Sequence, residues 1–190
     1  MTKRELRQVQ AIVLVVVSLA YLGFRNLPFH KSALPAPSVQ SEKSKDGFYY
    51  VSRVVDGDTL KLSDGERIRL TGVDTPEVHD SDKLLRDAKS SGKDVATIKA
   101  MGKRASDFTK SLVEGKSVRL EFDVKRRDRY GRLLAYVYLE DGTFVNAKII
   151  EEGYGQIMTI PPNVKYSDLF LKLEREAREK GKGLWKILKY

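Results

Sequence analysis

Three short strand-like runs separated by Asp-Gly turns constrain the fold of this chain most strongly. The runs are apolar or alternate between apolar and polar residues, and they lie at 48–55, 59–62 and 66–73. In the third run, alternation places Ile68 and Leu70 on one face of the strand. Arg67 and Arg69 then face the other way. Because Asp-Gly favours tight reversals between strands, the runs predict an antiparallel meander.

Further periodic segments extend the meander to a small barrel. Strands are expected at 118–122 and 133–139, and helices at 98–115, 145–152 and 166–177. The charged segment 78–94 predicts a loop or a short helix, and 184–185 is expected to fold back onto the core. Five strands with a helix between the third and the fourth follow the order of an OB-fold Greek-key barrel. The predicted class is therefore α+β, mainly a β barrel, with about three α-helices.

Residues 1–46 differ in character from the rest of the chain. Lys3, Arg4 and Arg7 precede an apolar run at 11–24. This order is typical of a secretory signal or a membrane anchor, and the poor cleavage sites favour the anchor. The basic residues predict an extracytoplasmic domain, membrane-anchored or secreted after cleavage. We divide the chain into an N-terminal hydrophobic segment (1–29), a flexible linker (30–46) and a folded domain (47–190).

The composition narrows the classes of function. The chain has 35 Lys and Arg residues against 26 Asp and Glu residues, which gives a net charge of +9. A basic balance favours polyanions as partners, although a basic domain with no nucleic-acid role fits the charge equally well. Cysteine is absent, which excludes disulfides, thiol catalysis and zinc–cysteine sites.

Two acidic segments at strand ends carry the residues most suited to chemistry. The first reads DGDT at 56–59, and the second reads DTPE at 74–77, shortly after Arg69. Taken alone, an Asp-Gly pair is a turn signal, Asp74 can cap a turn, and Glu77 can be a solvated loop acid. Together, the carboxylates, threonine and arginine can hold a hard cation beside a phosphate and attack the phosphate with water. The two segments therefore point to a phosphodiester-cleaving enzyme.

Four separated motifs resemble the staphylococcal nuclease (thermonuclease) family. They are VVDGDTLKL at 54–62, IRLTGVDTPE at 68–77, DRYGRLLAY at 128–136 and GLW at 183–185. The resemblance covers the whole folded part and implies an OB barrel with helices. It also implies a calcium-dependent nuclease that cuts DNA and RNA with little sequence specificity. The implied reaction is in-line attack of water with departure of the 5′-oxygen, which leaves 3′-phosphate ends.

The resemblance further implies a role for each site residue. The implied roles are Ca2+ ligands (the carboxylates of Asp58 and Asp74 and the backbone carbonyl of Thr75), phosphate-binding groups (Arg69 and Arg132), a residue that positions or deprotonates water (Glu77), a nucleotide contact (Tyr130) and a carboxylate beside the metal (Asp56). Oxygen ligands suit Ca2+, and guanidinium forks match phosphate oxygens. A carboxylate within hydrogen-bond reach of water can accept its proton.

Two regions differ from the family pattern. The segment 154–162 lacks an expected aromatic pair, and the charged segment 78–99 is longer than expected. The aromatic pair expected after the short helix is missing at 154–162, where Tyr154 is the one aromatic residue. Base stacking is therefore expected to be weaker or to come from elsewhere. The basic residues of 78–99 either line a path for nucleic acid or belong to a solvated surface loop.

The expected partners follow from the family resemblance and from the N-terminal sequence. They are DNA and RNA, preferably single-stranded or locally unpaired, and the membrane through an uncleaved N-terminal segment, with the chain a monomer. The alternative function is a non-catalytic OB-fold module, tethered to the membrane, that binds nucleic acid or a protein.

Overall fold

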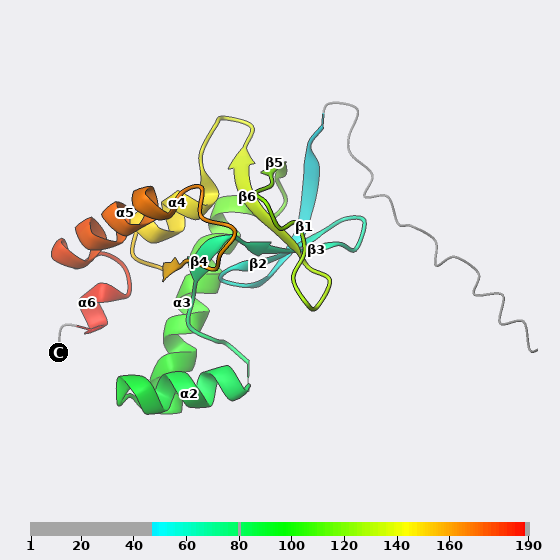
Figure 1. The fold of residues 1–190 in the computed structure, drawn as a ribbon. Coiled ribbons are helices and arrows are strands. Elements are labelled where there is room, and N and C mark those ends of the chain that lie inside the picture. The colour runs from blue at the N-terminus through cyan, green and yellow to red at the C-terminus, as the bar shows by residue number, and fades with distance from the viewer. Residues whose placement is uncertain (1–46, 80, 189–190) are drawn as a thin grey trace, which may run out of the picture. The chain divides into compact units, whose positions relative to one another are not determined.

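The computed structural model describes residues 47–79 and 81–188. Five strands close into a barrel in which every neighbouring pair is antiparallel except β3 and β6, which run parallel (Figure 1). In barrel order, the strands are β1 (Tyr49–Asp56), β2 (Thr59–Leu62), β3 (Arg67–Leu70), β6 (Leu133–Leu139) and β5 (Ser117–Glu121). This arrangement confirms the predicted five-stranded OB-fold barrel of the α+β class.

The first three barrel strands form the predicted meander. β1 pairs with β2 and β2 pairs with β3, both in antiparallel register. Ile68 and Leu70 are 0% and 1% exposed and point into the core, whereas Arg67 and Arg69 lie on the outer face. Burial of such inward-facing apolar side chains is the main source of the barrel's stability.

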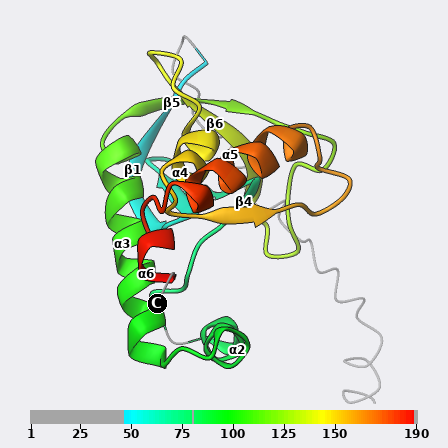
Figure 2. The ribbon, with the colours of Figure 1, turned by 90° about the vertical axis from the view of Figure 1, so that its left-hand side faces the viewer.

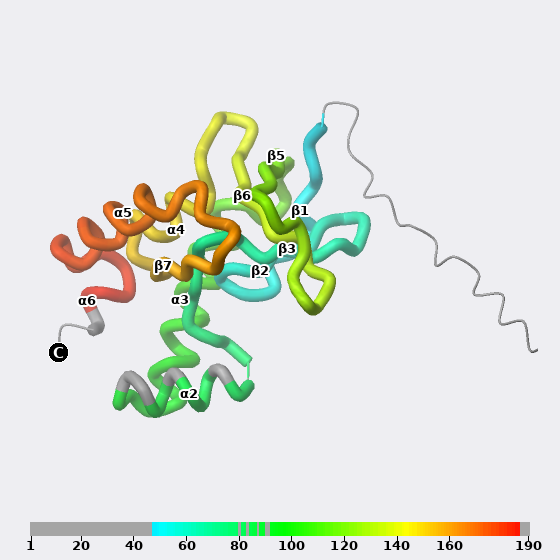
Figure 3. Tube along the Cα trace, viewed as in Figure 1, coloured from blue at the N-terminus to red at the C-terminus, as the bar shows by residue number. Residues whose placement is uncertain are grey.

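The predicted third strand, 66–73, is divided by a bend after Leu70. Its last part forms β4 (Gly72–Asp74; labelled in Figure 1), which pairs antiparallel with β7 (Gln156–Met158; labelled in Figure 3). Gly72 has a φ of +79°, in the left-handed region that favours glycine. A Cβ at Gly72 would also lie 2.5 Å from Phe170 Cε2. The bend therefore depends on glycine, and it carries Asp74 away from the barrel sheet.

Helices cover the barrel. The helices are α2 (Asp82–Ser91), α3 (Val95–Val113), α4 (Val145–Glu151), α5 (Ser167–Glu179) and α6 (Trp185–Leu188). Figure 2 shows α3 running along one side of the barrel, with α2 at its N-terminal end. The predicted helices correspond to α3, α4 and α5. Of the two alternatives for 78–94, a loop or a short helix, the structure shows the helix, α2, and α6 is additional to the prediction.

Helix α2 begins at a serine N-cap inside the charged segment 78–94. The Ser81 side chain accepts a hydrogen bond from the Leu84 backbone N–H at 3.1 Å, as an N-cap does. Leu84 is fully buried and packs with Ile98 and Met101 of α3 and with Leu184. These contacts confirm that the C-terminal segment folds back onto the core.

The predicted N-terminal hydrophobic segment (1–29) and linker (30–46) lie outside the described residues. Among the helices from residue 47 onward, none combines the length and the apolar character that crossing a membrane requires.

Candidate active site

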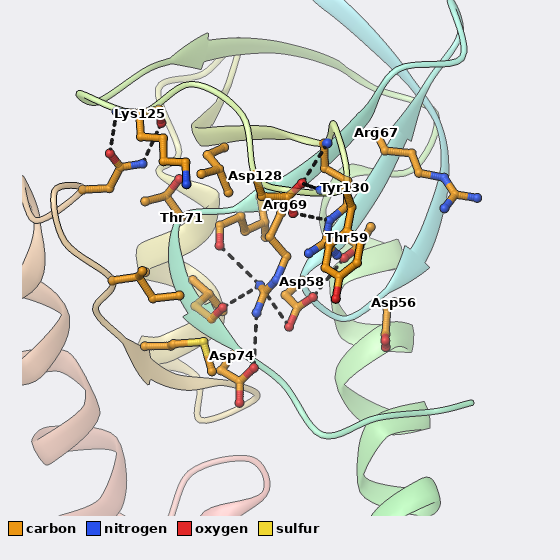
Figure 4. A pocket seen from close by; sticks show the side chains of 18 of the residues that line it. Asp56, Asp58, Thr59, Arg67, Arg69, Thr71, Asp74, Lys125, Asp128 and Tyr130 are labelled. Atoms are coloured by element: carbon orange, nitrogen blue, oxygen red, sulfur yellow. Dashed lines mark hydrogen bonds and ion pairs between the residues drawn. The ribbon is translucent and has the colours of Figure 1, made fainter. Parts of the chain in front are cut away.

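A cavity of about 650 Å³ lies where the acidic segments meet the loop before β6 (Figure 4). Of the residues predicted for the site, the cavity is lined by Asp56, Asp58, Arg69, Asp74, Glu77, Tyr130 and Arg132. Thr75 lies behind this surface, 2% exposed, and contacts Asp58. The structure therefore brings together residues that are far apart in the sequence.

Asp58 is fixed by several hydrogen bonds at the turn between β1 and β2. Its Oδ2 accepts from the backbone N–H of Thr75 at 3.0 Å and from the Thr75 hydroxyl at 3.1 Å. Its Oδ1 accepts from the Thr59 hydroxyl at 3.0 Å. Thr75 thus holds Asp58 in place with both its backbone and its side chain. Its predicted role as a carbonyl ligand stays a prediction.

Arg69 lies between the two predicted metal-binding carboxylates. Its Nη1 is 3.0 Å from Asp58 Oδ2, and its Nη2 donates to Asp74 Oδ1 at 3.2 Å (Figure 4). Nη1 also donates to the Val73 carbonyl oxygen at 2.6 Å, which fixes the guanidinium against β4. The sequence predicted a phosphate contact for Arg69. The structure adds a bridge between the carboxylates.

The donor set fits a hard divalent cation. Asp58 and Asp74 are each 5% exposed, and the two carboxylates with one guanidinium leave one net negative charge. Within the described residues, Asp, Glu, His and Cys form no group of three or more that would enclose a metal ion. A bound cation would therefore complete its shell with carbonyl, water and phosphate oxygens, as Ca2+ readily does.

Arg132 is oriented by the carboxylate of Asp128, for which the sequence predicted no separate role. Asp128 Oδ2 accepts from Arg132 Nε at 2.7 Å, and Asp128 Oδ1 accepts from the backbone N–H groups of Arg132 and Tyr130 at 3.0 and 2.9 Å. Burial raises the pKa of Asp128, but the hydrogen bonds from Arg132 and Tyr130 outweigh burial and hold this pKa below its usual value. The Arg132 side chain binds the Asp128 carboxylate through Nε, and Arg132 also lines the cavity.

Asp128 should give a pH-dependent contribution to stability. Because its folded pKa is lowered, the ionised form stabilises the fold above the usual carboxyl pKa, and this stabilisation is lost as the pH falls through the folded value. Asp128→Asn should lower the free energy of unfolding by about 1 kcal/mol at pH 7. Urea unfolding across a pH series should show the difference shrinking in acid. A difference that does not vary with pH would contradict this assignment.

Helix α3 supports both acidic segments from behind. The buried Thr109 hydroxyl donates to the Gly57 carbonyl oxygen at 2.7 Å. A Cβ at Gly102 would lie 2.5 Å from the carbonyl oxygen of Glu77 and 2.7 Å from that of Pro76. Glycine inside a helix costs about 1 kcal/mol relative to alanine, so Gly102 is explained by this close approach. The helix therefore sets the position of Glu77.

Gly102→Ala should destabilise the protein, although the same change at an open helical position is stabilising. The added methyl group has to displace backbone, and overpacking of this kind costs about 1–3 kcal/mol. Movement of Glu77 should also lower kcat on single-stranded DNA. Urea unfolding and turnover measure the two effects, with the exposed Arg104→Ala in the same helix as a control. A more stable and fully active Gly102→Ala protein would contradict the positioning role.

Part of the cavity wall is aliphatic. Met158, Ile160 and Pro161, from the segment that lacks the expected aromatic pair, line the cavity. Tyr154 does not line the cavity and instead stacks on Phe108, with ring centroids 4.3 Å apart. The cavity wall therefore offers a base an apolar contact surface without a ring from this segment. The described basic side chains of 78–99 do not line the cavity either.

Three residues that the sequence did not predict for the site support predicted site residues. Asp128, Thr109 and Gly102 each hold a predicted site residue or its segment in place. A glycine within the apolar stripe of a helix was a detectable signal for Gly102. The run KRRDRYGR at 125–132 was a signal for the basic loop around Asp128.

The chain is similar in sequence to known nucleases that share a family domain. A family model described as "Staphylococcal nuclease homologue" matches residues 67–187. The chain is 39% identical over 178 residues to a thermonuclease of Staphylococcus intermedius, covering 92% of each chain. It is 33% identical to a thermonuclease of Staphylococcus hyicus, covering 92% of this chain and 95% of the relative. An endonuclease of Bacillus subtilis is 36% identical over 140 residues, which are 71% of this chain and 60% of the relative.

The chain therefore belongs to the staphylococcal nuclease family. Its relatives and its family domain identify it as a nuclease, a hydrolase that acts on phosphodiester bonds. These findings confirm the predicted family and enzyme class, and they favour the enzyme over a non-catalytic binding module.

Proposed function

We propose that this nuclease depends on calcium, cuts both DNA and RNA with little sequence specificity, and leaves 3′-phosphate ends. The observation that carries the proposal is the pair of buried carboxylates, Asp58 and Asp74, bridged by Arg69 at the wall of a cavity that also contains Glu77 and Arg132. An acidic pair, cationic groups and a further carboxylate thus share one space large enough for a nucleotide.

The carboxylates of Asp58 and Asp74 and the carbonyl of Thr75 are the groups that would hold Ca2+. When bound, Ca2+ supplies positive charge beside the phosphodiester and reduces its repulsion of an attacking oxygen. The one net negative charge of the two carboxylates and Arg69 favours binding of a dication at this place.

The other site residues act directly on substrate and water. Arg69 and Arg132 bind the phosphate oxygens and stabilise the charge that develops during attack. Glu77 orients a water molecule and accepts its proton as the new oxygen–phosphorus bond forms. The bond from phosphorus to the 5′-oxygen breaks on the opposite side, and the leaving oxygen takes up a proton from solvent water, which leaves a 3′-phosphate and a 5′-hydroxyl. Tyr130 contacts the nucleotide at the cavity rim.

Low sequence specificity is supported by the kinds of groups in the cavity. Guanidinium groups bind phosphate, which carries no sequence information, and an aliphatic wall contacts any base without reading its edge. A volume of about 650 Å³ suits one strand, so single-stranded or locally unpaired regions are the favoured substrates.

The proposed location is outside the cytoplasm, with the domain anchored to the membrane or secreted, and the chain acting as a monomer. The support is the basic and then apolar N-terminal sequence, 1–29, followed by the polar linker. The mass of the mature protein tests this location. An intact N-terminus supports the anchor, and loss of the apolar run supports secretion.

Product analysis tests the proposed reaction. The chain is incubated with single-stranded DNA and with RNA of the same sequence in Ca2+, and the fragment ends are identified by mass. We expect 3′-phosphate and 5′-hydroxyl ends from both polymers, with cuts at many different sequences. Fragments with 5′-phosphate ends, or binding without cleavage, would contradict the proposal.

A further inference from the structure

We propose that Arg67 forms a second phosphate subsite, which binds the phosphate next to the scissile one and makes oligonucleotides better substrates than dinucleotides. This inference rests on the proposed function, because it extends the same cavity along the substrate strand. It assigns a role to a residue that the site described above does not use.

Arg67 is placed beside Arg69 by the geometry of β3. The two arginines are separated by the buried Ile68 and lie on the same outer face of the strand. Residues two apart on a strand have Cα atoms about 7 Å apart. This separation is comparable to the distance between adjacent phosphates of an extended single strand, so the two side chains leave β3 about one nucleotide apart.

A second hollow adjoins the main cavity on the Arg67 side. Its volume is about 330 Å³, and it is lined by Asp64, Glu66, Arg67, Arg127, Tyr130 and Arg132. Arg67, Tyr130 and Arg132 line both hollows and so form the rim between them. Figure 4 shows the Arg67 side chain directed away from Arg69, on the far side of Tyr130. A strand that leaves the main cavity past Tyr130 therefore meets Arg67.

The charges of the second hollow leave Arg67 available for a ligand. Arg127 Nη1 is 2.9 Å from Glu66 Oε2, so these two groups neutralise each other. Asp64 Oδ1 accepts from the Glu66 backbone N–H at 2.9 Å, which fixes this carboxylate in the turn. Within the part of the chain that the structure describes, the Arg67 guanidinium has neither a hydrogen bond nor an ion pair. An exposed guanidinium of this kind can bind a phosphate without breaking an existing contact.

The test compares a thymidine dinucleotide, which has one phosphodiester, with a thymidine tetranucleotide, which has three. The full chain, Arg67→Gln and Arg104→Gln are assayed in Ca2+ at several salt concentrations. Arg104 is exposed on α3 and lines neither hollow, so it controls for the loss of one positive charge. The unmodified chain should cleave the tetranucleotide with the higher kcat/KM.

We expect Arg67→Gln to lower kcat/KM on the tetranucleotide by about tenfold, the effect of one charge-assisted hydrogen bond. The kcat/KM of Arg67→Gln on the dinucleotide should stay within about twofold of that of the unmodified chain. The kcat/KM of Arg104→Gln should stay within the same range on both substrates. The slope of log kcat/KM against log salt should become shallower by about 0.7 for Arg67→Gln on the longer substrate.

Two outcomes would overturn the subsite. One is an equal loss on both substrates, which would place Arg67 at the scissile phosphate or in the fold. The other is a kcat/KM of Arg67→Gln on the tetranucleotide that equals the kcat/KM of Arg104→Gln on the same substrate. Binding of fluorescent dinucleotide and tetranucleotide in a chelator separates this inference from the proposed reaction. If Arg67→Gln binds the tetranucleotide more weakly than the unmodified chain does, and binds the dinucleotide equally well, the subsite is supported even where no substrate is cleaved. If the unmodified chain cleaves neither substrate in Ca2+, calcium-dependent hydrolysis is contradicted and the subsite is not.

Discussion

Glu77→Gln should lower kcat on single-stranded DNA by about 10²–10⁴-fold, the range that a positioned general base contributes. Glutamine keeps the size and shape of the side chain but cannot accept a proton from water. Glu77 is half-buried in the cavity wall, and its backbone packs on α3 at Gly102, so the fold should survive the change. Turnover at saturating substrate, measured together with urea unfolding, checks both parts of this expectation.

The matched control for this change is Glu140→Gln. Glu140 is exposed after β6 and does not line the cavity, so its replacement removes the same charge from a distant place. The control should leave kcat unchanged. Equal turnover for Glu77→Gln and the unmodified chain would remove Glu77 from the reaction and leave the proton acceptor unassigned.

Arg132→Lys should lower kcat/KM by about 10²–10³-fold, the effect of removing one well-placed donor to a developing negative charge. Lysine keeps the positive charge but cannot bind two phosphate oxygens with a planar fork. It also cannot reproduce the 2.7 Å hydrogen bond from Nε to Asp128 that orients the group. The side chain of Arg132 is 28% exposed, so the free energy of unfolding should change by less than about 1 kcal/mol.

Arg127→Lys is the matched control for Arg132→Lys. Arg127 lies in the same loop and is also paired with a carboxylate, Glu66, but it does not line the main cavity. Its replacement should change kcat/KM by only a few-fold at most. Similar losses for the two variants would indicate a general effect of the basic loop and would contradict a specific phosphate contact by Arg132.

The barrel was predictable from the sequence because its strands carry a simple alternating pattern. Ile68 and Leu70 are buried and Arg67 is exposed, as the period of two requires. The bend after Leu70 was not predicted, because it depends on the packing of Gly72 against Phe170, a residue almost one hundred positions away. Alternation describes one strand, whereas a bend of this kind is decided by tertiary contact.

In the site, too, residue types were predictable from the sequence, whereas contacts between distant segments were not. The acidic motifs and Arg132 were identified because their residue types suit metal and phosphate chemistry. The bridge of Arg69 between Asp58 and Asp74 was not predicted, since it requires β4 to turn away from β3. Gly102 acts through contacts to other chain segments, which composition and spacing do not reveal.

Asp58 and Asp74 are proposed to hold a calcium ion that cleavage requires. The most direct test of this proposal is the rate of single-stranded DNA cleavage by the full chain and by Asp74→Asn as a function of free Ca2+, starting from an excess of chelator. We expect no cleavage in the chelator, recovery when Ca2+ is restored, and a higher Ca2+ requirement for Asp74→Asn. Undiminished cleavage in the chelator, or the same Ca2+ dependence for both proteins, would contradict the proposal.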